Sequence, residues 1–226
     1  PKFPNPFFAS KKAKEFEMSS VALTDYGNLF GAVEFLQKSE KEGIRPILGC
    51  ELFIPSYDDH TLKQYKRSQD YYWQLVVLVQ NEEGYKNLSQ LISKSYLDGF
   101  YYKPRVDTKL LKEFSNGLIA LSSGFNSEIN HHLFENNPEK AKEALQKYAS
   151  IFPDRYYVEL QDNGLQNQRE MNKNLISLAK ETSLPVVATN NVHYLSPSDA
   201  EAFDVLRAIQ MGRSVSSFQD LSLIHI

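Results

Sequence analysis

The sequence contains one cysteine, one tryptophan and no run of about 18 apolar residues, the length that a membrane-spanning helix needs. Cys50 has no partner for an internal disulfide, which fits a protein of the reducing cytoplasm. The first residues, PKFPNPFF, lack the apolar core and the cleavage site of a signal peptide. We therefore expect a cytoplasmic protein that makes no membrane contact.

The sequence also lacks a strong excess of charge of either sign. It has 25 Lys and Arg residues against 28 Asp and Glu residues, for a net charge of −3. This charge balance argues against a protein that binds nucleic acid over its whole surface, although the charge balance is compatible with a local basic patch. The chain has no tandem repeat, low-complexity segment or Pro/Gly-rich linker, so we expect one domain.

The last six residues, LSLIHI, are abruptly apolar after GRSVSSFQD. They match the translation of a transposon-end adaptor used in sequencing libraries. We interpret residues 221–226 as a non-native tail and give His225 no functional role. The alternative is the start of a real strand or helix. With the tail set aside as non-native, residues 1–220 form the domain.

Short apolar strands alternate with amphipathic helices, which predicts an α/β protein. The expected strands are 19–25, 45–55, 71–80, 116–124, 155–162 and 184–190, and the expected helices are 29–43, 81–99, 137–152, 167–183 and 196–212. Asn81 and Ser196 are expected to cap two helix starts, and Pro138 suits a first helical position. The alternation favours βα units around a parallel sheet, in a barrel or a doubly wound arrangement.

The helix expected over 29–43 has an apolar stripe that contains Phe30, Val33 and Leu36. We expect these three side chains to face inward, and Gly43 to form the C-terminal cap.

Polar residues follow five of the expected strands, at the ends where α/β folds carry their functional groups. These runs are Asp25-Tyr26-Gly27-Asn28, Gly49-Cys50-Glu51, Ser122-Ser123-Gly124, Gln161-Asp162-Asn163 and Asn190-Asn191-Val192-His193. Because side chains alternate along a strand, Asn191 and His193 are expected to share one face. The five runs predict a polar site at one rim of the fold.

With these runs aligned, the chain resembles the PHP (polymerase and histidinol phosphatase) domain at the N-terminus of bacterial DNA polymerase III alpha subunits. The matching segments are ALTDYGNLFGAVEF, GIRPILGCELFIP, LVVLVQNEEGYKNLSQLIS, GLIALSSG, YYVELQDNGL and LPVVATNNVHYL. The resemblance implies a distorted seven-stranded (β/α) barrel whose strand ends can hold a cluster of metal ions. It also implies that this chain starts after the first strand, which carries a His-x-His pair of ligands.

Six further ligand positions of the family fall on Tyr26, Glu51, Gln74, Gly124, Asn191 and His193. Only Glu51 and His193 keep a standard metal ligand. Amides, glycine and a protonated phenol do not supply the anionic carboxylates and neutral imidazoles that such clusters need. The resemblance thus implies a vestigial site without metal, in which Tyr26, Gln74 and Asn191 hydrogen-bond one another and Glu51.

Other interpretations of these residues stay open. Glu51 and His193 are weak candidates for binding one metal, Glu51 could act as a general base, and His193 could be an ordinary hydrogen-bonded histidine. An active metal-dependent PHP phosphoesterase or 3′–5′ exonuclease is the alternative function. A free-standing phosphatase of small substrates is disfavoured by TDYGNLFGAVEF and NEEGYKNL, which look specific to the polymerase.

The resemblance implies a role within a larger polymerase. The parent protein would extend DNA from dNTPs with Mg²⁺ held by carboxylates outside this chain, so this fragment would be inactive by itself. The expected partners are the remaining polymerase domains, DNA and dNTPs through the parent, and a proofreading exonuclease subunit docked on this domain.

Several other residues have an ordinary structural interpretation. Cys50 reads as a small buried residue, and His131-His132 as adjacent helix positions that point apart at the surface. The aromatic residues Tyr71, Tyr72, Trp73, Tyr101 and Tyr102 are expected to pack inside, with base stacking as the alternative. The segment FYYKPRVD (100–107), with Lys103 and Arg105, could approach DNA or a neighbouring domain.

Overall fold

The computed structural model describes residues 6–63, 72–163, 166–212 and 214. The strands are β1 (Ser20–Tyr26), β2 (Arg45–Pro55), β3 (Tyr72–Val79), β4 (Leu118–Leu121), β5 (Tyr156–Gln161) and β6 (Val186–Thr189). The helices are α1 (Pro6–Glu15), α2 (Ala32–Glu42), α3 (Glu82–Leu97), α4 (Thr108–Glu113), α5 (Glu128–Phe134), α6 (Pro138–Ile151), α7 (Gln166–Thr182) and α8 (Ala200–Met211), with a 3₁₀ turn η1 (Pro197–Asp199) before α8. Tyr71 and the tail 221–226 lie outside the described residues.

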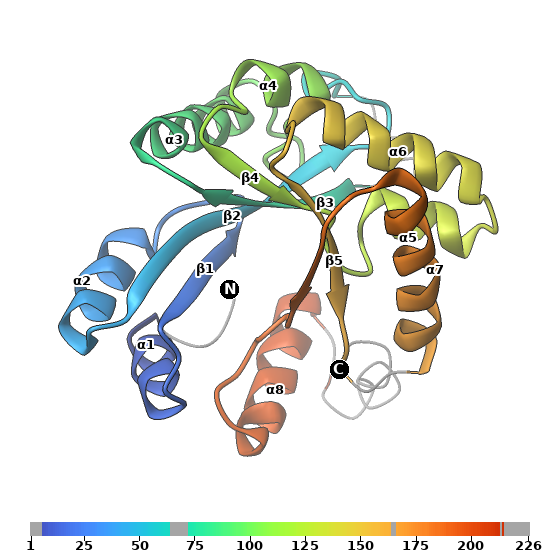
Figure 1. Cartoon of the computed structure of the whole chain (residues 1–226). Helices are drawn as coiled ribbons and strands as arrows, with labels where there is room; N and C mark the ends of the chain where they lie inside the picture. Colours follow the sequence, from blue (N-terminus) through green and yellow to red (C-terminus); the bar gives the residue numbers. More distant parts are fainter. Residues whose placement is uncertain (1–5, 64–71, 164–165, 213, 215–226) are drawn as a thin grey trace.

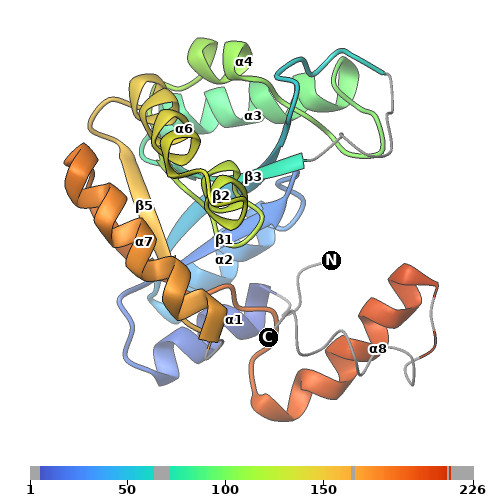
Figure 2. The same ribbon diagram turned by 90° about the vertical axis from the view of Figure 1, so that its right-hand side faces the viewer.

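The six strands form one curled sheet in the order β1-β2-β3-β4-β5-β6, which is an open half-barrel (Figure 1). The α/β class is therefore confirmed. The pairs β1–β2, β4–β5 and β5–β6 are parallel. The main core lies on the convex side, where apolar residues of β2–β5 meet α3, α4, α5, α6 and α7 (Figure 2).

The prediction of a parallel sheet is wrong for β3, which runs antiparallel to both β2 and β4. A parallel pair needs a crossover connection, usually a helix. The described part of the β2–β3 connection, 56–63, contains no helix. The reversal places the start of β3 beside the end of β2, with Gln74 opposite Phe53. Gln74 therefore joins the rim formed by the ends of its neighbours.

Local sequence signals explain most helix boundaries. The Asn81 side chain accepts a hydrogen bond from the Gly84 amide at 2.9 Å, as expected for a cap of α3. Gly43 ends α2 with φ of 72°, a left-handed conformation that glycine adopts without steric cost. Pro138 occupies the first turn of α6. The predicted Ser196 cap of the last helix is wrong. The 3₁₀ turn η1 separates Ser196 from α8, and the Asp199 carboxylate accepts a hydrogen bond from the Ser196 amide.

The expected inward face of α2 is also wrong. The exposed fractions of Phe30, Val33 and Leu36 are 85%, 65% and 37%, whereas Phe35 is buried. A polar contact explains the rotation of the helix, because the buried Ser39 hydroxyl pairs with the hydroxyl of Ser10 in α1 at 2.7 Å. None of the described helices is long and apolar enough to cross a membrane.

Candidate functional site

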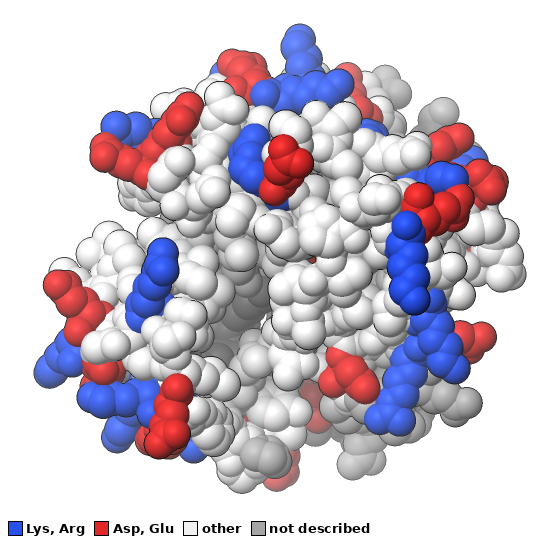
Figure 3. All heavy atoms as spheres, in the orientation of Figure 1, with Lys and Arg blue, Asp and Glu red and all other residues white. Residues whose placement is uncertain are grey.

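The concave side of the sheet carries a cavity of about 850 Å³ (Figure 3). Strand alternation divides β3 between two environments: Gln74, Val76 and Leu78 line the cavity, whereas Trp73, Leu75 and Val77 belong to the convex core. The visible face around the hollow is largely uncharged, and most Lys, Arg, Asp and Glu side chains lie toward its edges (Figure 3).

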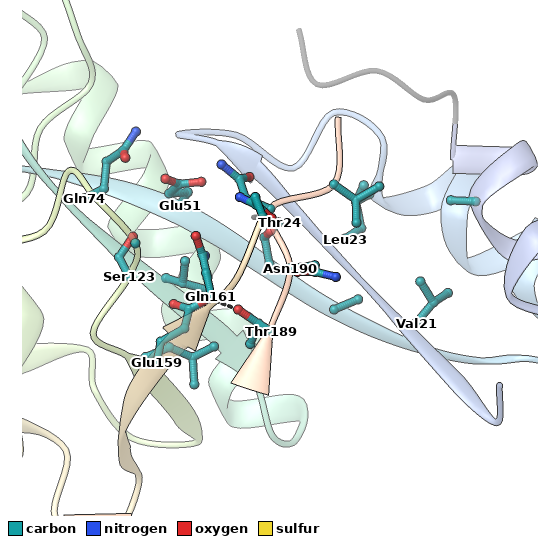
Figure 4. A pocket seen from close by; sticks show the side chains of 18 of the residues that line it. Val21, Leu23, Thr24, Glu51, Gln74, Ser123, Glu159, Gln161, Thr189 and Asn190 are labelled. Atoms are coloured by element: carbon teal, nitrogen blue, oxygen red, sulfur yellow. Dashed lines mark hydrogen bonds between the residues drawn. The ribbon is translucent and has the colours of Figure 1, made fainter. Parts of the chain in front are cut away.

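Polar side chains converge on this cavity from neighbouring strands. Figure 4 shows Glu51 of β2, Gln74 of β3, Ser123 after β4 and Gln161 of β5 directed toward a common space. The exposed fraction of Glu51 is 5%, so a carboxyl group is held in a poorly hydrated position. Four of the five predicted polar runs thus contribute side chains to the cavity, among them Glu51, Ser123, Gln161 and Asn190. Glu51 lies within β2 and not at its end.

Glu159 is a site residue that the sequence interpretation missed. It is 4% exposed, it lines the cavity, and its Oε1 accepts hydrogen bonds from Gln161 Nε2 at 3.0 Å and from the Thr189 hydroxyl. Its Oε2 has no hydrogen-bond partner among the described residues. The signal was present in the strand YYVELQ, because Glu159 and Gln161 are two residues apart and alternation places them on one face.

The space beside Gly124 is occupied by Gln161. A Cβ atom added to Gly124 would lie 2.5 Å from Gln161 Oε1 and 3.0 Å from its Cδ, closer than real Cβ contacts. The Gln161 amide is held there by its hydrogen bond to Glu159. A cysteine or histidine ligand at position 124 therefore does not fit without moving Gln161.

Tyr26 and Asn191 form a second linked pair. Burial raises the pKa of the Tyr26 phenol far above its usual value, and the negative charge of Glu51 raises it further. A hydrogen bond from the Asn191 side chain opposes this rise. Tyr26 also stacks on Phe53, with 6.2 Å between ring centroids. The phenol therefore stays protonated near neutral pH, which makes it a poor metal ligand.

His193 does not share a face with Asn191, so that prediction is wrong. Alternation holds only within a strand, and β6 ends at Thr189, before both residues. Asn191 lines the cavity, whereas the His193 ring stacks on Phe203 of α8 with 5.1 Å between centroids. The only imidazole at the six aligned positions is thus directed toward a helix.

The six aligned positions carry few standard metal ligands. They offer one carboxylate, Glu51, and one imidazole, which packs on Phe203. Among the described residues, the groups of His, Cys, Asp and Glu that lie close enough to share an ion are Asp59–His60–Asp107 and His131–His132–Glu135. Neither group contains any of the six positions.

The structure also shows how far Cys50, the aromatic residues and Arg105 are buried. Cys50 is fully buried, as predicted, and burial raises the pKa of its thiol to about 12. Trp73 packs inside as expected, but Tyr102 is 71% exposed. Arg105 is fully buried, where it donates hydrogen bonds to backbone carbonyls, so its side chain is not part of the surface that the segment 100–107 presents.

The His131-His132 interpretation is wrong as well. The two rings do not point apart at the surface: their centroids are 5.4 Å from each other, and both side chains are largely buried. Both imidazoles pack against Trp73, whose ring centroid lies 4.5 Å from that of His131 and 6.2 Å from that of His132.

Known proteins resemble this chain over most of its length. It is 40% identical to the DNA polymerase III subunit alpha of Helicobacter pylori over 217 residues, which cover 92% of this chain and 18% of that protein. It is 41% identical to the DNA polymerase III subunit alpha of Thermus aquaticus over 194 residues, which cover 86% of this chain and 16% of that protein. The chain thus spans less than a fifth of the length of these relatives.

The fold is shared with distant structures. The structure of an amidohydrolase from Chromobacterium violaceum matches with a TM-score of 0.51 and 11% identity, covering 85% of this chain and 84% of that one. Among protein families, the PHP domain matches residues 9–163. This match extends from α1 to the end of β5 and includes four of the six aligned positions, so the chain belongs to the PHP domain family.

Proposed function

We propose that this chain is the PHP portion of a bacterial DNA polymerase III alpha subunit in which the metal site has become structural. The observation that carries the proposal is the interlock between Gly124 and Gln161, which fills the space of an expected ligand with an amide. The hydrogen bond between Tyr26 and Asn191 supports the same conclusion at two further positions.

The chemistry of phosphoryl transfer explains why these changes abolish catalysis. A metal cluster generates a hydroxide nucleophile and stabilises the charge that develops on the phosphoryl group. It needs several anionic or imidazole ligands at fixed distances. Glu51 is retained, but Gln74, Asn191 and Tyr26 replace charged or imidazole groups with neutral ones. We therefore expect no hydrolysis of phosphate esters by this domain.

The parent protein would be a cytoplasmic DNA polymerase. It would extend DNA from dNTPs with Mg²⁺ bound by carboxylates outside this chain, and the PHP domain would support the other polymerase domains. It would also offer a docking surface for a separate proofreading exonuclease. These roles rest on the similarity to alpha subunits, of which this chain spans 18% in Helicobacter pylori.

A second candidate function is an active metal-dependent phosphoesterase or 3′–5′ exonuclease. One observation favours it: Glu51 and Glu159 are both almost fully buried and both line the cavity. Two carboxylates with little hydration could hold a divalent cation between them, because oxygen ligands suit Mg²⁺ and Mn²⁺. This site would differ from the usual PHP set, since no imidazole among the described residues lines the cavity.

Metal content and nuclease activity, measured together, separate the two candidates. The tag-free chain and its Glu51→Gln variant are dialysed against Mn²⁺, Zn²⁺ or Mg²⁺, and bound metal is measured by elemental analysis. Degradation of 3′-labelled single-stranded DNA is measured in parallel. We expect no ion that depends on Glu51 and no degradation. Two or more ions per chain, together with nuclease turnover that Glu51→Gln abolishes, would establish the second candidate.

The same assay on the parent polymerase, with its polymerase carboxylates substituted, tests whether residues outside this chain complete a metal site. His193→Ala is the informative variant there. The proposal predicts that this variant changes neither metal content nor nuclease activity, because His193 packs on Phe203.

A further inference from the structure

The C-terminal turn of α5 brings together three potential metal ligands from the sequence NHHLFE. His131 Nε2 lies 3.2 Å from Glu135 Oε1, and His132 Nδ1 lies 3.8 Å from Glu135 Oε2. One ligand atom of each residue lies within 4.8 Å of the other two. The two imidazoles and the carboxylate therefore surround one small space.

Packing, and not helical geometry, creates this arrangement. Adjacent helix positions point in directions about 100° apart, so two neighbouring histidines do not normally converge. Here the indole of Trp73 contacts both rings in a tilted arrangement, at centroid distances of 4.5 and 6.2 Å. Trp73 is 8% exposed and belongs to the main core, so it is a rigid platform for the two imidazoles. Such preorganisation lowers the entropic cost of binding an ion.

His132 carries the strongest sign of an unfilled interaction. Its Nδ1 is shielded from solvent and has no hydrogen-bond partner among the described residues. A buried polar atom in this state is costly, and its nearest acidic group is the Glu135 carboxylate at 3.8 Å, beyond hydrogen-bond distance. Burial is the main cause that lowers the pKa of His132 below its ordinary value.

We propose that His131, His132 and Glu135 form a binding site for a late first-row divalent cation, with Zn²⁺ as the best fit. Two imidazole nitrogens and one carboxylate oxygen are a usual ligand set for this ion, with water in the fourth position. Metal–ligand bonds of about 2.0–2.2 Å in a tetrahedron separate the ligand atoms by about 3.3 Å. The observed separation of 3.2 Å matches this value, whereas those of 3.8 Å and of up to 4.8 Å between ligand atoms must shorten to it, and the Glu135 side chain, which is 55% exposed, can rotate toward the imidazoles.

This site is distinct from the PHP cavity. Gln74 and Trp73 are neighbours in β3 and therefore point to opposite faces of the sheet. Gln74 lines the cavity, whereas His131 and His132 pack on Trp73 and are not among the described residues that line it. The proposed ion would fix the last turn of α5 on the outer face of β3, without contact with Glu51 or Glu159.

The single tryptophan provides a direct measurement of binding. The tag-free chain is titrated with NiCl₂ and with CuCl₂, whose ions quench a nearby indole, and Trp73 fluorescence is recorded. ZnCl₂ is then added as a competitor that does not quench. We expect saturable one-to-one quenching by Ni²⁺ and Cu²⁺, and reversal of the Ni²⁺ quenching by excess Zn²⁺; Cu²⁺ should resist displacement, because it binds such ligands more tightly than Zn²⁺.

Variants at Glu135 separate a metal site from a structural stack. Glu135→Gln should weaken binding at least about tenfold, because it removes one of three ligands. Glu135→His should retain binding, because imidazole replaces carboxylate. Glu139→Gln is the matched control, since it removes the same charge from an exposed neighbouring position on α6 and should leave binding unchanged. Far-UV circular dichroism of every variant checks that the fold is intact.

The quenching titrations of wild type and the variants distinguish a metal site from its absence. Tight quenching that Glu135→Gln weakens and Glu135→His restores supports the site. Absence of saturable quenching, or quenching that is equal in wild type and Glu135→Gln, overturns it. Metal that is lost on Glu51→Gln instead would assign the ion to the cavity and would also contradict this proposal.

Discussion

The interlock between Gly124 and Gln161 makes a quantitative prediction about stability. Substituting Gly124→Ala introduces a Cβ 2.5 Å from Gln161 Oε1, so the amide must move. Because Gln161 Nε2 donates to the buried Glu159 at 3.0 Å, the movement weakens that hydrogen bond. Because the clash involves only the end of a flexible side chain, the main cost is that hydrogen bond, about 0.5–1.5 kcal/mol of the free energy of unfolding.

The same substitution should have the opposite sign when Gln161 is absent. The Gly124 backbone lies outside the left-handed region, so alanine fits it without strain. In a Gln161→Ala background, Gly124→Ala meets no amide and should be neutral or stabilising by about 0.4–1 kcal/mol, because alanine restricts the unfolded chain. The coupling free energy between the two positions should therefore be about 1–2 kcal/mol.

Urea unfolding of the wild-type chain, both single variants and the double variant measures this coupling. Trp73 fluorescence is a suitable probe, because it is the only tryptophan and is 8% exposed in the core. Equal m-values in the four proteins would show that the unfolding reaction is the same in each. If Gly124→Ala destabilises both backgrounds equally, within about 0.5 kcal/mol, the interlock does not exist and the argument for a filled ligand position fails.

Four further predictions follow from individual contacts. Arg105→Met should lower the free energy of thermal unfolding by about 3–5 kcal/mol, because removal of the fully buried guanidinium leaves the carbonyls of Gly99, Leu62 and His60 without their donor. A loss below about 1 kcal/mol would refute this role. Asn81→Ala should cost about 1 kcal/mol through loss of the α3 cap, and an unchanged melting temperature would contradict it. Burial raises the pKa of Asp107, but hydrogen bonds from Leu110 and His60 outweigh burial and hold the pKa below its usual value. The stability that the Asp107 carboxylate contributes should be complete above about pH 4 and lost as pH falls through the lower pKa of the folded state. The unfolding free energies of wild type and Asp107→Asn should therefore converge in acid, and parallel pH profiles would argue against this role. Deleting residues 221–226 should leave the unfolding free energy unchanged if they are adaptor-derived, and a loss above about 1 kcal/mol would show that they belong to the fold.

The sequence predicted the α/β class, the six strands and the polar runs because these depend on local patterns. Helix caps such as Asn81 and Pro138 follow from chemistry within one turn, and they agree with the structure. The direction of β3 could not be read in this way. It depends on how the β2–β3 connection crosses the sheet, and strand periodicity is identical for both directions.

Side-chain environments were predicted less well than elements. The apolar stripe of α2 suggested that Val33 faces inward, but a buried contact between Ser39 and Ser10 sets the helix rotation. Arg105 looked like a surface cation, yet backbone carbonyls from a segment more than 40 residues away surround it. Both errors arise from long-range partners, which a local pattern does not contain.

The residues at the aligned ligand positions contact neighbouring polar side chains, and these contacts support a structural role better than the number of lost ligands does. A ligand can be lost by drift, which would leave a void or an unpaired polar group at that position. Here the space at Gly124 is filled by Gln161, which in turn hydrogen-bonds Glu159, and the Asn191 amide is bonded to the Tyr26 phenol. Two of the substituted positions are thus joined to neighbouring polar groups, in one case through Gln161 and in the other directly. A single reversion such as Asn191→Asp would therefore add a negative charge beside the buried Glu51 and disturb the Tyr26 contact, without supplying the imidazoles that a metal cluster requires.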